Sequence, residues 1–94
     1  MTERRSLTRE DKEILCITQE ECAEVTQAIS KIIRFGIDET YNGRTNAARL
    51  EDEVGDLYTM LDILVEKKLL DVKRIEEAKK AKREKLRTWS RISV

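Results

Sequence analysis

Residues 8–36 read TREDKEILCITQEECAEVTQAISKIIRFG, and this stretch decides the fold class. Its apolar residues recur at intervals of three and four, the spacing of one face of an α-helix. Thr8 offers a hydroxyl as an N-cap, acidic residues follow it in the first turn, and Gly36 fits a helix stop. We therefore predict one long helix, whose apolar face holds Ile14, Ile17, Cys22, Val25, Ala28, Ile29, Ile32 and Phe35.

Two further helices are predicted after one loop. The pair Asn42–Gly43 is a turn signal within the loop, Asn46 or Thr45 can cap the second helix, and Asp71 can cap the third. The expected elements are a loop over 36–46, a helix over about 47–67 and a helix over about 72–90. Their apolar stripes are Leu50, Val54, Leu57, Leu61 and Leu64 in the second helix, and Ile75, Ala78, Leu86 and Trp89 in the third.

The composition favours an all-α fold in a single domain over residues 1–94. Charged residues make up 40% of the chain, aromatic residues make up 4% and proline is absent, which disfavours a β-sandwich or barrel. A domain of this length buries only about 60–65% of its unfolded surface, so its own core is marginal. We expect a helical hairpin plus a third helix, which form a four-helix-bundle-like core by oligomerisation as a homodimer or homotetramer.

The residue content also disfavours several classes of site and location. The chain has no histidine, which excludes zinc fingers with His ligands, Ser-His-Asp catalysis and di-iron sites built on Glu-x-x-His. Cys16 and Cys22 point about 120° apart on one helix, which does not suit a mutual disulfide and fits a reducing compartment. No apolar run approaches about 18 residues and the first residues are polar, so we expect a cytoplasmic protein with no membrane contact.

Four carboxylates fall on apolar helix faces, where charged residues are not expected. At about 100° per residue, Glu21 lies in the middle of the first apolar stripe and Glu24 lies about 60° away on its flank. Glu53 and Asp56 repeat this i, i+3 arrangement in the second helix. A single such acid more often pairs with Lys or Arg, or lies at the edge of a subunit. Two matched pairs on adjacent helices favour a cation site, and oxygen ligands suit Mg²⁺ or Mn²⁺.

Basic residues are concentrated after this acidic centre. Residues 21–70 contain 6 basic and 10 acidic residues, whereas residues 71–94 contain 9 basic and 4 acidic ones. Lys82 falls inside the apolar stripe of the third helix, where its ammonium would either hold an anion or reach water past its aliphatic stem. Zero net charge, the acidic centre and the few aromatics argue against nucleic-acid binding.

Two acidic motifs carry a family resemblance. Residues 20–24 read EECAE, which matches EExxE, and residues 53–56 read EVGD, which matches ExxD, with 28 residues between them. Together they resemble the MazG-like enzymes, members of the all-α nucleoside triphosphate pyrophosphohydrolases. Residues 30–36 (SKIIRFG) and 82–86 (KREKL) are similar to small single-domain members, and the similarity extends over about 15–89. The Asn/Arg-rich motif of the dimeric dUTPases is missing after the ExxD helix.

The resemblance implies Mg²⁺-dependent hydrolysis of a nucleoside triphosphate between its α and β phosphates. The products would be the monophosphate and pyrophosphate, for control of the nucleotide pool. Carried over by motif, the metal ligands are Glu21, Glu24, Glu53 and Asp56. Two alternatives remain open. One is a related enzyme acting on dUTP, dCTP or phosphoribosyl-ATP, and the other is a non-enzymatic helical oligomerisation or interaction module.

The remaining site residues are assigned by their chemistry. Glu20 or Glu24, if not saturated by metal, is expected to take the proton of the attacking water. The expected phosphate-binding residues are Lys82, Lys85, Arg34 and Lys31, and the expected base or ribose contacts are Tyr41, Asn42, Arg44 and Trp89. The alternative role of Trp89 is helix packing, and the alternative role of Tyr41 is to cover the loop.

Overall fold

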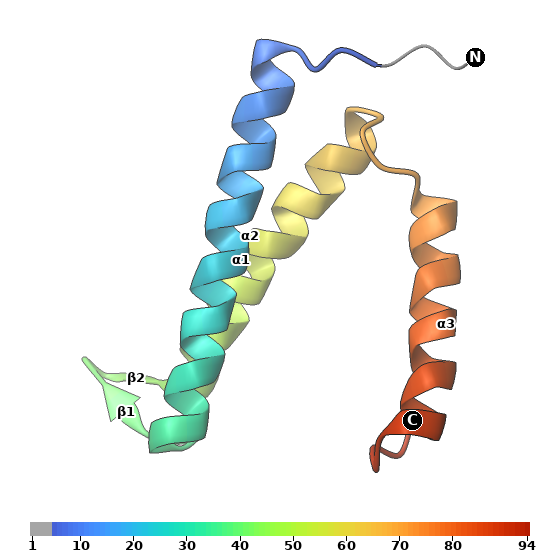
Figure 1. The fold of residues 1–94 in the computed structure, drawn as a ribbon. Coiled ribbons are helices and arrows are strands. Elements are labelled where there is room, and N and C mark those ends of the chain that lie inside the picture. Colours follow the sequence, from blue (N-terminus) through green and yellow to red (C-terminus); the bar gives the residue numbers. More distant parts are fainter. Residues whose placement is uncertain (1–4) are drawn as a thin grey trace.

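The computed structural model describes residues 5–94 and contains three helices and one short β-hairpin (Figure 1). The elements are α1 (Arg9–Phe35), β1 (Thr40–Tyr41), β2 (Arg44–Thr45), α2 (Asn46–Glu66) and α3 (Val72–Trp89). α1 and α2 lie side by side in opposite directions, whereas α3 stands apart from them (Figure 1). The predicted helical class is confirmed, with helix ends within about one residue of those expected. Within the described residues, no helix combines the length and apolarity needed to cross a membrane.

The start of α1 is capped as predicted and is tied to the end of α2. The Thr8 hydroxyl oxygen accepts from the backbone N–H of Asp11 at 3.0 Å, and the Asp11 carboxylate accepts from the backbone N–H of Thr8 at 2.9 Å. This backbone hydrogen bond lowers the pKa of Asp11. The Lys67 ammonium lies 2.9 Å from a carboxylate oxygen of Glu10, so one ion pair links the two helices at this end.

The predicted loop over residues 36–46 is wrong in one respect, because it contains a β-hairpin. β1 and β2 pair antiparallel through two residues each. The predicted turn is confirmed, since Asn42 and Gly43 join the strands at φ angles of 51° and 77°. These are the left-handed values of a two-residue type I′ turn. Strands of two residues are too short to produce an alternating pattern, so the sequence indicates the turn but not the pairing.

A buried side chain fastens the hairpin to the end of α1. Asn46 is 5% exposed, and its side-chain Nδ2 donates to the carbonyl oxygen of Gly36 at 2.9 Å. Its backbone N–H donates to the carbonyl oxygen of Glu39 at 2.9 Å. The Thr45 hydroxyl oxygen caps α2 by accepting from the backbone N–H of Ala48 at 3.1 Å. The hairpin is therefore held close to the C-terminal end of α1 and the N-terminal end of α2.

α1 and α2 share a thin interface. Among residues 5–94, the buried apolar residues are Ile14 and Leu64, which are 7% and 3% exposed. Most other residues of the two predicted stripes are half-buried: Val25, Ala28, Ile32, Leu50, Val54, Leu57 and Leu61. The exceptions are exposed, contrary to the prediction: Ile17, Cys22, Ile29 and Phe35. Two packed helices cover only one side of each other, so this hairpin has one layer of contacts and no enclosed core.

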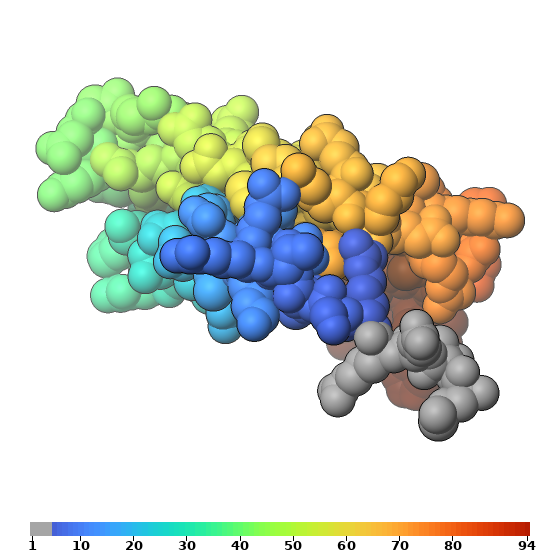
Figure 2. All heavy atoms as spheres, turned by 90° about the horizontal axis from the view of Figure 1, so that it is seen from above, coloured from blue at the N-terminus to red at the C-terminus, as the bar shows by residue number. Residues whose placement is uncertain are grey.

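α3 makes no comparable interface with the rest of the described chain. Its stripe residues Ile75 and Leu86 are half-buried, and Trp89 is 84% exposed. The radius of gyration is 16.8 Å, larger than the roughly 12 Å of a compact domain of this length. From above, the β-hairpin lies at one end of the molecule and α3 at the other (Figure 2). The oligomeric bundle stays a prediction.

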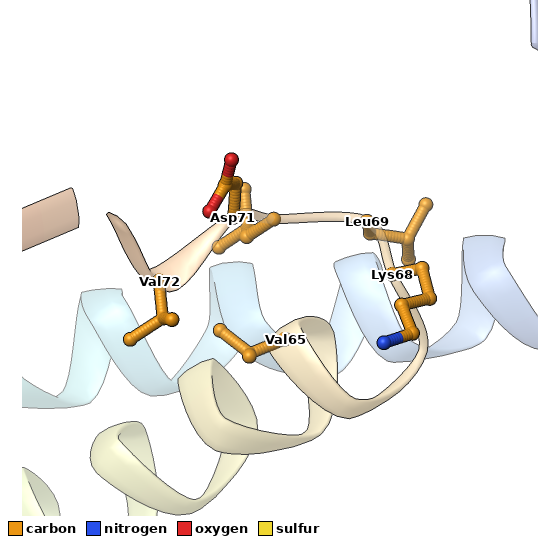
Figure 3. A pocket seen from close by; sticks show the side chains of 6 residues that line it. Val65, Lys68, Leu69, Asp71 and Val72 are labelled. Carbon is orange, nitrogen blue, oxygen red and sulfur yellow. The ribbon is translucent and has the colours of Figure 1, made fainter. Parts of the chain in front are cut away.

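The joint between α2 and α3 is hollowed. A cavity of about 400 Å³ lies there, lined by Val65, Lys68, Leu69, Leu70, Asp71 and Val72 (Figure 3). Lys68 has a φ of 64°, a left-handed value that ends α2 and turns the chain toward α3. The joint lies at the end of α2 remote from the hairpin, so this cavity is separate from the acidic residues near the middle of α1 and α2 (Figure 1).

Candidate metal centre

The helix pairing brings together carboxylates from α1 and α2. Glu21 and Glu24 lie one turn apart on α1, and Glu53 and Asp56 lie one turn apart on α2. One carboxylate oxygen each from Glu21, Glu53 and Asp56 lies within 4.8 Å of the others. We refer to these three residues as the acidic cluster. Glu21 and Glu53 are half-buried and Asp56 is exposed, so the cluster opens to solvent on the side of Asp56.

The spacing of the acidic cluster suits a small divalent cation. Oxygen ligands around an octahedral Mg²⁺ lie 2.0–2.1 Å from the ion, and therefore about 3–4 Å from one another. The oxygens of the acidic cluster lie within 4.8 Å of one another, close enough for one such ion to be shared by the three side chains after they adjust. Three carboxylates leave further coordination positions for water or phosphate oxygens, which Mg²⁺ commonly retains.

The electrostatics of the cluster also favour a cation. Burial raises the pKa of Glu53, and the negative charges of Glu24, Asp56 and Glu21 raise it further. Within residues 5–94, no basic side chain forms an ion pair with any of these four acids. The alternative that each acid pairs with a Lys or Arg of its own chain is therefore not realised there. Their mutual repulsion would be relieved by a bound divalent cation.

Glu24 and Glu20 lie outside the acidic cluster. Glu24 is exposed and lines a cavity of about 170 Å³ together with Glu53. We name this the cluster cavity, and its walls are Glu24, Ala28, Lys31, Arg44, Arg49, Asp52 and Glu53. Glu20 is exposed on α1 and lines neither this cavity nor the cluster. Of the two predicted proton acceptors, Glu24 therefore stands closer to Glu53.

Three basic residues line the cluster cavity together with its three acidic ones. Lys31 and Arg44, both predicted as ligand contacts, line it, and Arg44 forms an ion pair with Asp52 at 2.6 Å. Arg49 also lines it and was not among the predicted residues. One signal in the sequence points to Arg49, since it precedes Glu53 by four residues and so lies one turn away on the same helix face.

A second and larger cavity adjoins the first. We name it the hairpin cavity; it has a volume of about 450 Å³ and is lined by Lys31, Phe35, Glu39, Thr40, Tyr41, Asn46 and Arg49. Lys31 and Arg49 belong to both cavities. The Arg49 Nη2 donates to the carbonyl oxygen of Tyr41 at 2.8 Å, and its guanidinium carbon lies 5.1 Å from the centre of the Tyr41 ring. The hairpin thus brings Tyr41 back to α2.

The other predicted contact residues lie elsewhere. Arg34 stacks on Phe35 at 4.9 Å and lines neither of these two cavities. Asn42 forms the tip of the hairpin turn, where its left-handed backbone gives it a structural role. Exposed Lys82, Lys85 and Trp89 lie on α3, which does not pack against the α1–α2 hairpin. Both cysteines, Cys16 and Cys22, are exposed and free.

Comparison with known proteins adds no assignment to this geometry. No model of a known protein family matches the chain, and neither a curated protein nor a solved structure matches it. The arrangement itself offers three carboxylates for a cation, a fourth beside them, and basic groups between the cluster and a pocket with two aromatic rings. These are groups that can bind a divalent cation together with a polyanion.

Proposed function

We propose that this chain is a divalent-metal-dependent nucleoside triphosphate pyrophosphohydrolase. The observation that carries the proposal is the acidic cluster, whose three carboxylates lie within 4.8 Å of one another without a basic partner in residues 5–94. Lys31 and Arg49 beside it offer the positive charge that a phosphate chain requires. The order and spacing of EExxE and ExxD, which resemble the MazG-like enzymes, support a nucleoside triphosphate as the substrate.

The acidic cluster would hold Mg²⁺, with Mn²⁺ as a substitute. Both are hard cations that prefer carboxylate oxygens, and the cluster offers three of them from Glu21, Glu53 and Asp56. When bound, the ion supplies neutralisation of phosphate charge and lowers the pKa of a coordinated water. Exposed Asp56 marks the side from which a ligand can approach.

The residues around the cluster would position the substrate and move one proton. Glu24 accepts the proton of the attacking water, because it faces the same cavity as Glu53 without belonging to the cluster. The water oxygen bonds to the α-phosphorus as the bond from that phosphorus to its bridging oxygen breaks. The pyrophosphate leaves with its charge met by Lys31 and Arg49. The products are a nucleoside monophosphate and pyrophosphate, consistent with a role in nucleotide-pool control in the cytoplasm.

We further propose that the active form is a homodimer or homotetramer. The α1–α2 interface is one layer deep, and α3 leaves Trp89 84% exposed. A second copy packed against these faces would bury apolar surface that one chain leaves in water. The same observation favours a second candidate function, a non-enzymatic helical interaction module in which the acids of one copy meet the basic residues of another.

Pyrophosphate release from a panel of ribo- and deoxyribonucleoside triphosphates tests the proposal. We expect release that requires Mg²⁺ and yields the monophosphate. Glu53→Gln or Glu21→Gln should lower kcat at least about 100-fold, because each removes a charged metal ligand. Glu51→Gln is the matched control, since Glu51 is exposed on the same helix and lies outside the cluster.

Three outcomes would contradict the proposal. Release of orthophosphate would mean that a different bond is cut. Equal decreases of kcat in Glu51→Gln and Glu53→Gln would mean that a general effect of charge, rather than metal ligation, lowers the rate. No turnover across the panel, together with no effect of Mg²⁺ on the melting temperature, would favour the interaction module.

A further inference from the structure

We propose that the hairpin cavity binds the base of the nucleoside triphosphate, and that Arg49 joins this base site to the acidic cluster. Because the proposed function sets the phosphates beside the cluster, the assignment rests on that function. Its new content is the direction in which the substrate lies and the residues that recognise its two ends. Phe35 and Tyr41 face the base, whereas Lys31 and Arg49 hold the phosphates.

The aromatic content of the hairpin cavity suits a planar ligand. The chain has only four aromatic residues, and two of them, Phe35 and Tyr41, line this one cavity. Their side chains are 56% and 66% exposed, so neither ring serves as a core residue of the single chain. A base stacked on such a ring removes apolar surface of both partners from water, whatever the identity of the base.

Each of the two rings makes a cation–π contact with an arginine. The guanidinium carbon of Arg34 lies 4.9 Å from the centre of the Phe35 ring, and that of Arg49 lies 5.1 Å from the centre of the Tyr41 ring. Both distances are those of cation–π contacts, which are attractive when the cation lies over the ring face. The exposed remainder of each ring is the surface that a base would cover.

Arg49 is the link between the two cavities. Arg49 lines both of them, and the hydrogen bond from its Nη2 to the carbonyl oxygen of Tyr41 holds the guanidinium against the β-hairpin. Its Nε is buried and has no hydrogen-bond acceptor among the described residues. A buried N–H without an acceptor destabilises the free protein, and a phosphate or ribose oxygen at this position would satisfy it.

The charges determine which end of the nucleotide lies in which cavity. Lys31 and Arg49 line both cavities, so the other charged residues distinguish them. In the hairpin cavity this residue is Glu39, whose carboxylate would repel a triphosphate placed there. In the cluster cavity three acids stand against Arg44, and a divalent cation at the cluster would offset their excess negative charge. Lys31 and Arg49 lie between the two, where the sugar joins the phosphates. The base therefore lies toward the hairpin and the triphosphate toward Glu53.

Binding to analogues that resist cleavage tests this orientation. Isothermal titration calorimetry in Mg²⁺ compares α,β-methylene nucleoside triphosphates, in which carbon replaces the bridging oxygen, with tripolyphosphate, which has no base. Tyr41→Ala should weaken analogue binding about tenfold and change tripolyphosphate binding less than about twofold. Tyr58→Ala is the matched control, because Tyr58 is 63% exposed on α2 and lines neither cavity. Arg49→Ala should weaken binding of both ligands.

Several results would overturn the base site. The first is an equal effect of Tyr41→Ala and Tyr58→Ala on analogue binding. The second is a loss of tripolyphosphate affinity in Tyr41→Ala as large as its loss of analogue affinity. The third is equal affinity of the wild type for the two ligands. Pyrophosphate release by the wild type combined with any of these would leave the proposed function standing. Base-dependent binding without pyrophosphate release would instead support the base site and reject the hydrolase. Circular dichroism of each variant checks that it remains helical.

Discussion

Replacing Glu53 by glutamine is expected to stabilise the metal-free protein and to abolish its stabilisation by Mg²⁺. A Glu53 oxygen lies within 4.8 Å of oxygens of Glu21 and Asp56. Two unit charges at about 4.8 Å repel by about 0.9 kcal/mol in bulk water, and by about half of that at physiological ionic strength. Removing one charge ends two such repulsions, a gain of about 1 kcal/mol. For a domain of this size, that gain raises Tm by about 4–8 °C.

Thermal unfolding followed by circular dichroism measures this effect. The wild-type Tm should rise with Mg²⁺ and then follow the logarithm of its concentration, as expected for a ligand that binds only the folded state. The Glu53→Gln protein should start from a higher Tm and stay there. Sodium chloride at matched ionic strength corrects for screening, and Glu51→Gln controls for loss of a surface charge. A lower metal-free Tm in Glu53→Gln, or an undiminished Mg²⁺ response, would refute the reasoning.

The stabilities of the wild type and of Glu53→Gln should depend on pH in a direction that follows from the pKa of Glu53. Burial, followed by the charges of Glu24, Asp56 and Glu21, raises the pKa of Glu53 in the folded state. The folded protein therefore holds this proton more tightly than the unfolded chain does. Stability of the metal-free wild type should fall as pH rises above the pKa of this carboxyl in the unfolded chain, which for an ordinary glutamate is about 4.3. Glu53→Gln should show a smaller fall over the same range.

Three further predictions concern the scaffold. Leu64→Ala should lower the free energy of unfolding by about 2–3 kcal/mol in urea titrations, because Leu64 is 3% exposed and the thin interface can partly collapse. Thr8→Ala should cost about 1 kcal/mol in the same assay, since it removes the oxygen that caps α1, and Thr8→Ser should retain most of that stability. Emission from Trp89, the only tryptophan, should shift to shorter wavelength as concentration rises; a constant spectrum would contradict the homo-oligomer.

The helices could be predicted because their signals are local. Thr8 and Asp11 form the capping box within four residues, and Asp71 caps α3 through the backbone N–H of Lys73 at 2.9 Å. The separation of α3 could not be predicted in the same way. An amphipathic pattern indicates that one face will be covered, but it does not say whether the cover comes from the same chain. Trp89 lies on that face and remains exposed in the single chain.

In the candidate site, too, the residues set by helical phase could be predicted and the residue placed by the β-hairpin could not. Glu21, Glu53 and Asp56 could be predicted because each lies on or beside the apolar stripe of its helix, and stripes of paired helices face each other. Arg49 was missed because it belongs to no motif. Its position at the joint of two cavities depends on the hairpin, which returns the Tyr41 carbonyl to within 2.8 Å of the Arg49 side chain. That contact follows from the turn and from the anchoring of the strands, not from helical phase.

The opposite charges of α2 and α3 bear on how the site is completed. α2 contains one basic and six acidic residues, whereas α3 contains eight basic and three acidic ones. α3 nevertheless holds Lys82 and Lys85 on a helix that does not pack against its own α1–α2 hairpin. A second copy could present both its apolar stripe and these lysines to the acidic face, with burial supplying affinity and charge supplying orientation. If so, the concentration at which Trp89 emission shifts should also be the concentration above which pyrophosphate release per chain increases.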